Sequence, residues 1–162
     1  MKRQLVRGEV VERYTLVDEE MTVVLAHYFF GTNADFIRLW KTKKFKYVNN
    51  YVLEVLSLME KLRFVREIFP LHKSVIADIE RLNNLRNGIA HSYFPENLRS
   101  AKPTWKGKDI FSVGGLKAFQ EDMYAVHRAL TSKRSRVGPK KSPSSSLAPS
   151  PLAPALTENN QS

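Results

Sequence analysis

Apolar residues recur at three- and four-residue steps through most of this chain, a period that places them on one face of a helix. The pattern is strongest over residues 46–69, where the apolar face is more than one residue wide and includes Tyr51 and Val55. Such a face packs against two neighbours, as in a helix bundle. The same period predicts a first helix over residues 3–30, a last one over 113–131, and another with Ser74 as its N-cap. We therefore expect an all-α fold of four or five helices.

Polar side chains predict a solvated helix face and a helix cap. The charged side chains within residues 46–69, Lys61 among them, are expected on a solvated face of the helix. Asn33 or Asp35 is expected to cap a short helix that runs to Trp40. Each of these expectations follows from local sequence alone.

Two segments lack the helical period. Residues 95–112 are polar and basic around Trp105 and are predicted to form a loop. From Lys133 the composition changes to Ser, Pro and basic residues, with five of the eight prolines. Such a composition cannot bury enough apolar surface to fold. We predict one folded domain over residues 1–132 and a disordered tail over 133–162.

The net charge of +10 is spread over both parts of the chain. Residues 1–132 hold 21 of the 26 Lys and Arg residues and 15 of the 16 acids, so the predicted domain is itself basic. A basic surface attracts polyanions, and RNA or DNA is the expected partner. A solvated positive face without a partner is the simpler alternative.

Several classes of protein are excluded or disfavoured by what the sequence lacks. It has no cysteine, which excludes disulfides, thiolate metal sites and a Cys nucleophile, and which fits a reducing cytoplasm. No apolar run reaches the roughly 18–20 residues of a membrane span, and no signal peptide is recognisable. Glycine-rich phosphate loops and the H-E-x-x-H metal motif are also missing, so kinase, P-loop and metalloprotease functions have no support.

The residues best suited to chemistry lie close together late in the chain: Arg86, Asn87, His91 and Tyr93. Arg grips a phosphate through parallel hydrogen bonds, and His both takes and gives a proton near neutral pH. With no carboxylate or thiol beside them, these residues favour metal-free phosphate chemistry. The structural alternative is that the Asn87–Gly88 pair marks a helix end, with Arg86 and His91 as favourable cations of a last turn.

The spacing of Arg86, His91 and Tyr93 resembles the R-x4-H-x-Y motif of HEPN domains. Asn87 after the Arg, with Leu85 before it and Ala90 before the His, is also similar to the family pattern. HEPN domains are small helical modules, and many are metal-independent ribonucleases of toxin–antitoxin, phage-defence or RNA-processing systems. The resemblance therefore implies a HEPN-like bundle that cleaves RNA without a metal or cofactor.

In the mechanism implied by this resemblance, Arg86, Asn87 and His91 are catalytic. The RNA 2′-hydroxyl attacks the adjacent phosphate and leaves a 2′,3′-cyclic phosphate. The family site resembles a composite one in a homodimer, which eases a geometric problem, since positions five apart lie about 140° apart around a helix. The long Arg side chain or a loosened helix near Gly88 would solve the same problem. Tyr93 resembles a residue that a partner nucleotidyltransferase modifies to silence such toxins, although a structural tyrosine is the alternative.

Residues 41–47 interleave lysines with aromatic side chains, which suits phosphate contacts combined with base stacking. Lys43, Lys44 and Lys46 are therefore candidate RNA contacts. Lysine stems also cover aromatic rings for ordinary packing reasons. The competing function is a non-catalytic helical module that binds RNA or protein. A DNA-binding regulator is a third option, although no helix-turn-helix pattern supports it.

Overall fold

The computed structural model describes residues 3–31, 38, 41–91 and 103–134. Within these ranges the chain is an all-α helical bundle with one small β-hairpin, as the sequence predicts. The elements are α1 (Arg3–Phe30), α3 (Lys43–Val48), the π-helical turn η1 (Asn49–Leu53), α4 (Leu58–Ile68), α5 (Lys73–His91), β1 (Thr104–Trp105), β2 (Lys108–Asp109) and α6 (Val113–Arg134).

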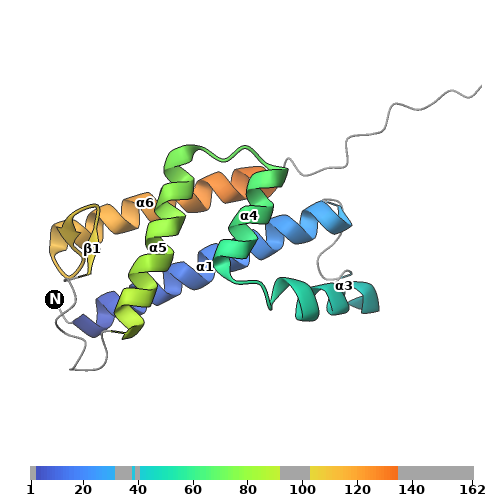
Figure 1. Ribbon diagram of the computed structural model, residues 1–162, viewed down its shortest axis with the longest axis horizontal. Helices are drawn as coiled ribbons and strands as arrows, with labels where there is room; N and C mark the ends of the chain where they lie inside the picture. Colours follow the sequence, from blue (N-terminus) through green and yellow to red (C-terminus); the bar gives the residue numbers. More distant parts are fainter. Residues whose placement is uncertain (1–2, 32–37, 39–40, 92–102, 135–162) are drawn as a thin grey trace, which may run out of the picture.

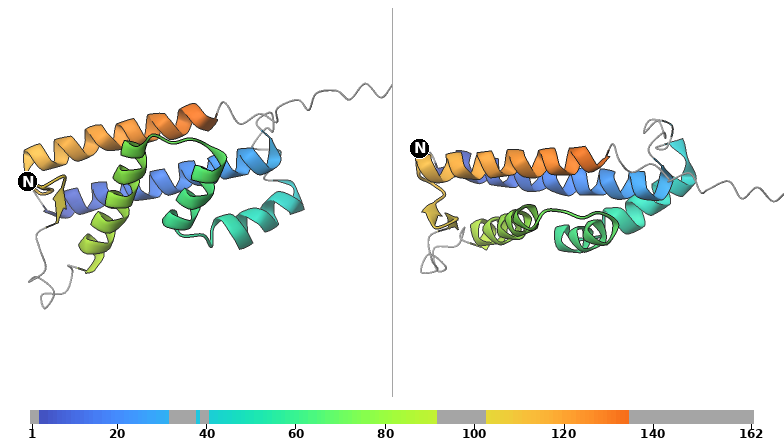
Figure 2. Two further views of the ribbon diagram at one scale, coloured as in Figure 1. Left: turned by 45° about the horizontal axis from the view of Figure 1, so that its top comes forward. Right: turned by 90° about the horizontal axis from the view of Figure 1, so that it is seen from above.

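The helices form two layers (Figures 1 and 2). The long helices α1 and α6 run side by side in the same direction and make up one layer. Helices α4 and α5 run antiparallel to each other and cross the same side of α1 as the second layer. Helix α3 lies near the C-terminal end of α1. The core fills the space between the layers with side chains from every helix: Val10, Met21, Val24, Phe45, Leu62, Val65, Ile79, Leu82, Phe119, Met123 and Leu130 are among them.

The prediction of a single helix over residues 46–69 is wrong. The α-helical hydrogen bonds of α3 give way to the wider π-helical turn η1, in which the Glu54 backbone N–H donates to the Asn49 carbonyl at 2.8 Å. A turn follows, and Ser57 then starts α4 in a new direction. Apolar spacing continues across the break, so periodicity alone did not reveal it. Two side chains assigned to the apolar face, Tyr51 and Val55, are in fact 71% and 73% exposed.

Lys61 is buried, contrary to its predicted place on a solvated face. Its ammonium nitrogen lies 2.6 Å from a carboxylate oxygen of Asp18 in α1. The Lys61 side chain is only 3% exposed. The ion pair therefore stabilises the packing of α4 against α1 from inside the contact between the two helices.

Helix α5 begins one residue before its predicted cap. The imidazole Nδ1 of His72 accepts a hydrogen bond from the Ser74 backbone N–H at 3.3 Å, and the His72 carbonyl accepts from Val75 and Ile76. His72, and not Ser74, thus provides the capping groups, because its side chain reaches the first turn. From there α5 runs without interruption through Gly88 to His91.

Part of the loop predicted over residues 95–112 is a β-hairpin, in which Thr104 pairs with Asp109 and Trp105 with Lys108. Trp105 is completely buried, packs edge-to-face on Phe119 at 5.0 Å, and donates its indole N–H to Asp122 at 2.7 Å. The sequence signalled a loop because the two strands are too short to show an alternating pattern.

Helix α6 continues to Arg134, two residues beyond the predicted domain boundary. The predicted caps Asn33 and Asp35 and the predicted tail beyond residue 134 lie outside the described residues. Among the described residues, no helix combines the length and apolar character that crossing a membrane requires.

Candidate functional site

Helix α5 carries three of the four residues that resemble the HEPN motif. Leu85 and Ile89 face the core, so Arg86, one position after Leu85, projects to the exposed side of the helix. The guanidinium Nη1 donates to the Asn87 side-chain oxygen at 3.2 Å. His91 is the last residue of α5, and its side chain is outside the described part of the structure, as is all of Tyr93.

Tyr14 of α1 is a neighbour of this cluster that the sequence did not reveal. The guanidinium carbon of Arg86 lies 5.2 Å from the centre of the Tyr14 ring, within cation–π range. Burial raises the pKa of the Tyr14 phenol, while the charge of Arg86 opposes this shift and that of Asp18 adds to it. The half-buried ring therefore stays neutral at physiological pH and offers its face to the cation. No sequence signal links Tyr14 to Arg86, because the two residues meet only when α5 crosses α1.

Positions 86 and 91 lie about 140° apart around an ideal helix. The continuity of α5 leaves fewer ways for Arg86 and His91 to contact the same phosphate. The helix does not loosen at Gly88, which keeps ordinary helical geometry. Two arrangements remain for bringing both residues to one phosphate. In one, the long Arg86 side chain reaches round the helix. In the other, the residues meet across a dimer.

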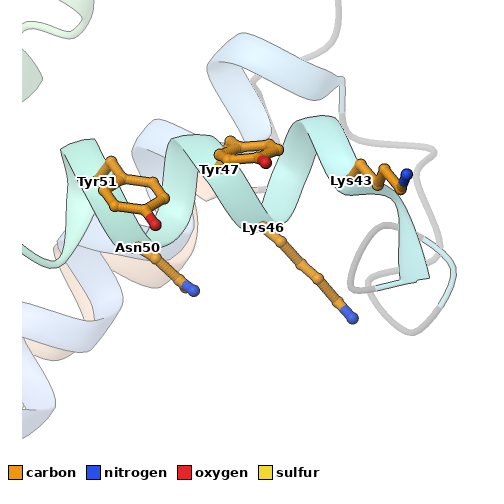
Figure 3. A pocket seen from close by; sticks show the side chains of 5 residues that line it. All are labelled: Lys43, Lys46, Tyr47, Asn50 and Tyr51. Atoms are coloured by element: carbon orange, nitrogen blue, oxygen red, sulfur yellow. The ribbon is translucent and has the colours of Figure 1, made fainter.

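The three candidate RNA-contact lysines separate into two groups. Lys43 and Lys46 line an open hollow of about 260 Å³, together with Tyr47, Asn50 and Tyr51 of α3 and η1. Figure 3 shows these five side chains along one stretch of the helix. Lys44 instead points to Phe30 of α1, with its nitrogen 5.9 Å from the ring centre. Lys44 thus has the packing role that was the alternative for all three.

The hollow extends beyond residues 41–47 to Asn50 and Tyr51, which the sequence-based prediction of RNA contacts did not include. The rings of Tyr47 and Tyr51 stack with their centres 5.7 Å apart and their planes inclined by 23°. Asn50 lies between them in the chain and receives a hydrogen bond from Asn49 on its side-chain oxygen at 3.3 Å. Tyr51 was assigned to the apolar face by its spacing, but it lies at the surface, as does Tyr47 four residues earlier.

No group of three His, Asp or Glu side chains in the described parts of the chain is arranged to hold a metal ion. Comparisons of the chain with protein-family models, curated proteins and solved structures find no match. The functional assignment therefore depends on the chemistry of the chain's own residues.

Proposed function

We propose that this chain is a metal-independent endoribonuclease of HEPN type. The observation that carries the proposal is the guanidinium of Arg86, which is exposed on α5, backed by the Tyr14 ring and bonded to Asn87, on the helix that ends at His91. An exposed, oriented guanidinium suits a phosphate ligand, because its planar fork matches two phosphate oxygens.

In the proposed reaction the RNA 2′-oxygen attacks the adjacent phosphorus and the bond from phosphorus to the 5′-oxygen breaks. A base removes the 2′-hydroxyl proton, and an acid protonates the departing 5′-oxygen. His91 serves in one of these roles. Arg86 stabilises the charge that develops on the phosphate, and Asn87 positions Arg86. The products are a 2′,3′-cyclic phosphate and a 5′-hydroxyl, and no metal is needed because the nucleophile is already in place.

The biological setting that goes with this activity is a toxin–antitoxin, phage-defence or RNA-processing system in the cytoplasm. The proposed active form is a homodimer in which two motifs face a shared cleft. An antitoxin or nucleotidyltransferase partner would act at Tyr93. The high net charge of +10 supports RNA as the substrate over a neutral or cationic ligand.

The deciding experiment incubates the full-length protein with transfer RNA and with a single-stranded RNA, both in the presence of a chelator. We expect cleavage that ends in cyclic phosphate, and no cleavage of DNA of the same sequence. Arg86→Ala and His91→Ala are each expected to lower the rate by at least about a hundredfold. Their circular dichroism should stay unchanged, because Arg86 is exposed and His91 ends its helix.

Lys117→Gln is the matched control for loss of one exposed cation on another helix, α6, and it should cleave like the wild type. Cleavage that survives His91→Ala would overturn the mechanism. Cleavage that requires added metal would also overturn the mechanism.

A non-catalytic helical module is the second candidate. The contacts of Arg86 with Tyr14 and Asn87 favour it, because they also fit a purely structural guanidinium. This candidate predicts that neither wild type nor His91→Ala cuts RNA, although both are folded. Mass measurement of Tyr93 then distinguishes such a module from a nuclease that is silenced by modification.

A further inference from the structure

The surface of α3 and η1 presents two aromatic rings that the fold leaves outside its core. Tyr47 is 63% exposed and Tyr51 is 71% exposed, yet their rings stack on each other. Phe45, two residues earlier, is buried and anchors the segment against Phe30 of α1. The buried Phe45 thus anchors the helix that carries the tyrosine pair, while the outer faces of the two rings remain exposed.

The formal charges on residues 41–51, which include this pair, are all positive. Residues 41–51 contain four lysines and no acid. Lys43 and Lys46 line the same hollow as the two rings, and Figure 3 shows both extending from the helix beside them. The acid that follows, Glu54, accepts a hydrogen bond from the buried Asn49 side chain. The Glu54 carboxylate therefore has a hydrogen-bond partner at the C-terminal end of η1.

Asn50 adds a neutral donor to the hollow. Asn49 donates to the side-chain oxygen of Asn50, so the Asn50 amide nitrogen is the end presented outward, on the side of Lys46 in Figure 3. The lining residues recur at steps of three and four and so share one face of α3 and η1, and the Asn49 carbonyl of this π-helical turn accepts from Glu54 five residues later. Turns of this kind are uncommon and recur at functional sites.

We propose that this surface, formed by Lys43, Lys46, Tyr47, Asn50 and Tyr51, binds a short segment of single-stranded polynucleotide. Nucleobases stack on the exposed tyrosine faces, and the lysines and the Asn50 amide contact the flanking phosphates. Stacked aromatic side chains among cations are the usual means of holding single strands without reading their sequence. A duplex does not fit, because its bases already stack on one another. The binding requires no cleavage and so extends beyond the proposed nuclease activity.

The test uses the full-length protein and a fluorescent 2′-O-methyl oligouridylate, which cannot be cut because it has no free 2′-hydroxyl. Replacing both rings, Tyr47→Leu with Tyr51→Leu, is expected to weaken binding by about tenfold to a hundredfold. Replacing both cations, Lys43→Gln with Lys46→Gln, should reduce the slope of log affinity against log salt by about 1.4. Both pairs are exposed, so the helical circular dichroism should not change.

Matched variants on other elements separate local contacts from general effects. Tyr124→Leu removes a tyrosine of α6 that is also 63% exposed, and it should bind like the wild type. Lys108→Gln with Lys117→Gln removes two exposed cations from β2 and α6 and should affect binding less than the Lys43 and Lys46 pair. A DNA of the same sequence shows whether RNA or DNA is the better ligand, and tighter binding of either supports the site.

Three results would overturn the proposal: unchanged affinity in the double tyrosine variant, equal affinity for duplex RNA, or equal effects of the two lysine pairs. None of these results depends on whether the protein cleaves RNA. Conversely, a protein that binds the uncleavable strand through these residues and cuts nothing would retain this site while losing the proposed nuclease function.

Discussion

At the scale of single residues, the buried ion pair between Lys61 and Asp18 is expected to be sensitive to substitution. The two side chains are unequally buried: that of Lys61 is 3% exposed and that of Asp18 is 29% exposed. A partner left charged in a buried position is expensive, whereas one that reaches water is not. The two ends of this pair should therefore respond differently to substitution.

We expect Asp18→Asn to lower the free energy of unfolding by about 3 kcal/mol, because it leaves the buried Lys61 ammonium without its counter-charge. Lys61→Met should cost less, about 1 kcal/mol, because Met fills similar space and Asp18 can be solvated. Urea unfolding of both variants and of the double variant measures each cost and the coupling between them. Equal costs for the two single variants would contradict this account of the pair.

At the scale of elements, the N-cap of α4 fixes where the second helix within residues 46–69 begins. The Ser57 side chain accepts a hydrogen bond from the Glu60 backbone N–H, and Glu60 accepts from the Ser57 backbone N–H at 2.8 Å. The hydrogen bonds from the Ser57 side chain and backbone lower the pKa of Glu60. This reciprocal arrangement is a capping box, which satisfies N–H groups that a helix cannot pair internally.

Ser57→Ala is expected to lower the free energy of unfolding by about 1 kcal/mol, because it removes this cap. The cost should come from α4, so hydrogen exchange should quicken in its first turn before the rest of the bundle is affected. Thr15→Ala, which changes an exposed hydroxyl inside α1, provides the comparison and should leave stability within about 0.5 kcal/mol of the wild type. A Ser57 variant as stable as the Thr15 variant would show that the cap is dispensable.

At the scale of the whole molecule, the β-hairpin joins the two layers through one lysine. The Lys106 ammonium lies 2.7 Å from Asp122 of α6 and 3.2 Å from Asp78 of α5. Burial alone would raise the pKa of Asp122, but hydrogen bonds from Lys106 and Trp105 bring it below its ordinary value. Burial likewise acts to lower the pKa of Lys106, and its bonds to both carboxylates raise it instead.

These shifts give the hairpin contact a defined dependence on pH. A carboxyl group with a lowered pKa stabilises the fold above its unfolded pKa, about 3.9 for Asp, and this contribution is lost as the pH falls through the folded value. The raised pKa of Lys106 means that its own contribution persists until the pH exceeds about 10.4. The ion pairs are thus complete at neutral pH and weaken first on the acid side.

We expect Lys106→Met to lower the free energy of unfolding at pH 7 by about 1 kcal/mol, a modest value because the Lys106 side chain is 39% exposed. At pH 3 the difference from the wild type should shrink, because the contribution of Asp122 declines once the pH falls below its unfolded pKa of about 3.9. The backbone at position 106 is left-handed, with φ 47°. This conformation strains Met and Lys alike, so the substitution does not change the backbone strain. Denaturant unfolding at both pH values measures this, and an equal difference at pH 7 and pH 3 would rule out the ion pairs as its cause.

Local sequence was enough to predict the all-α class, the long helices α1 and α6, and the place of Arg86 and Asn87 on a helix. These features depend on residues a few positions apart, and helical period and neighbouring side chains report such relations directly. The proposed catalytic roles of Arg86, Asn87 and His91 stay predictions, since they come from a resemblance carried by a few residues.

The tertiary structure alone decided which residues meet across the fold. Tyr14 reaches Arg86, Lys61 reaches Asp18, and Trp105 reaches Asp122 only because α4, α5 and the hairpin cross the long helices. It also decided where the chain departs from regular α-helix, since η1 and the turn before Ser57 interrupt residues 46–69 while the apolar spacing continues. Burial and pairing are properties of segments that are distant in sequence, and no local period encodes them.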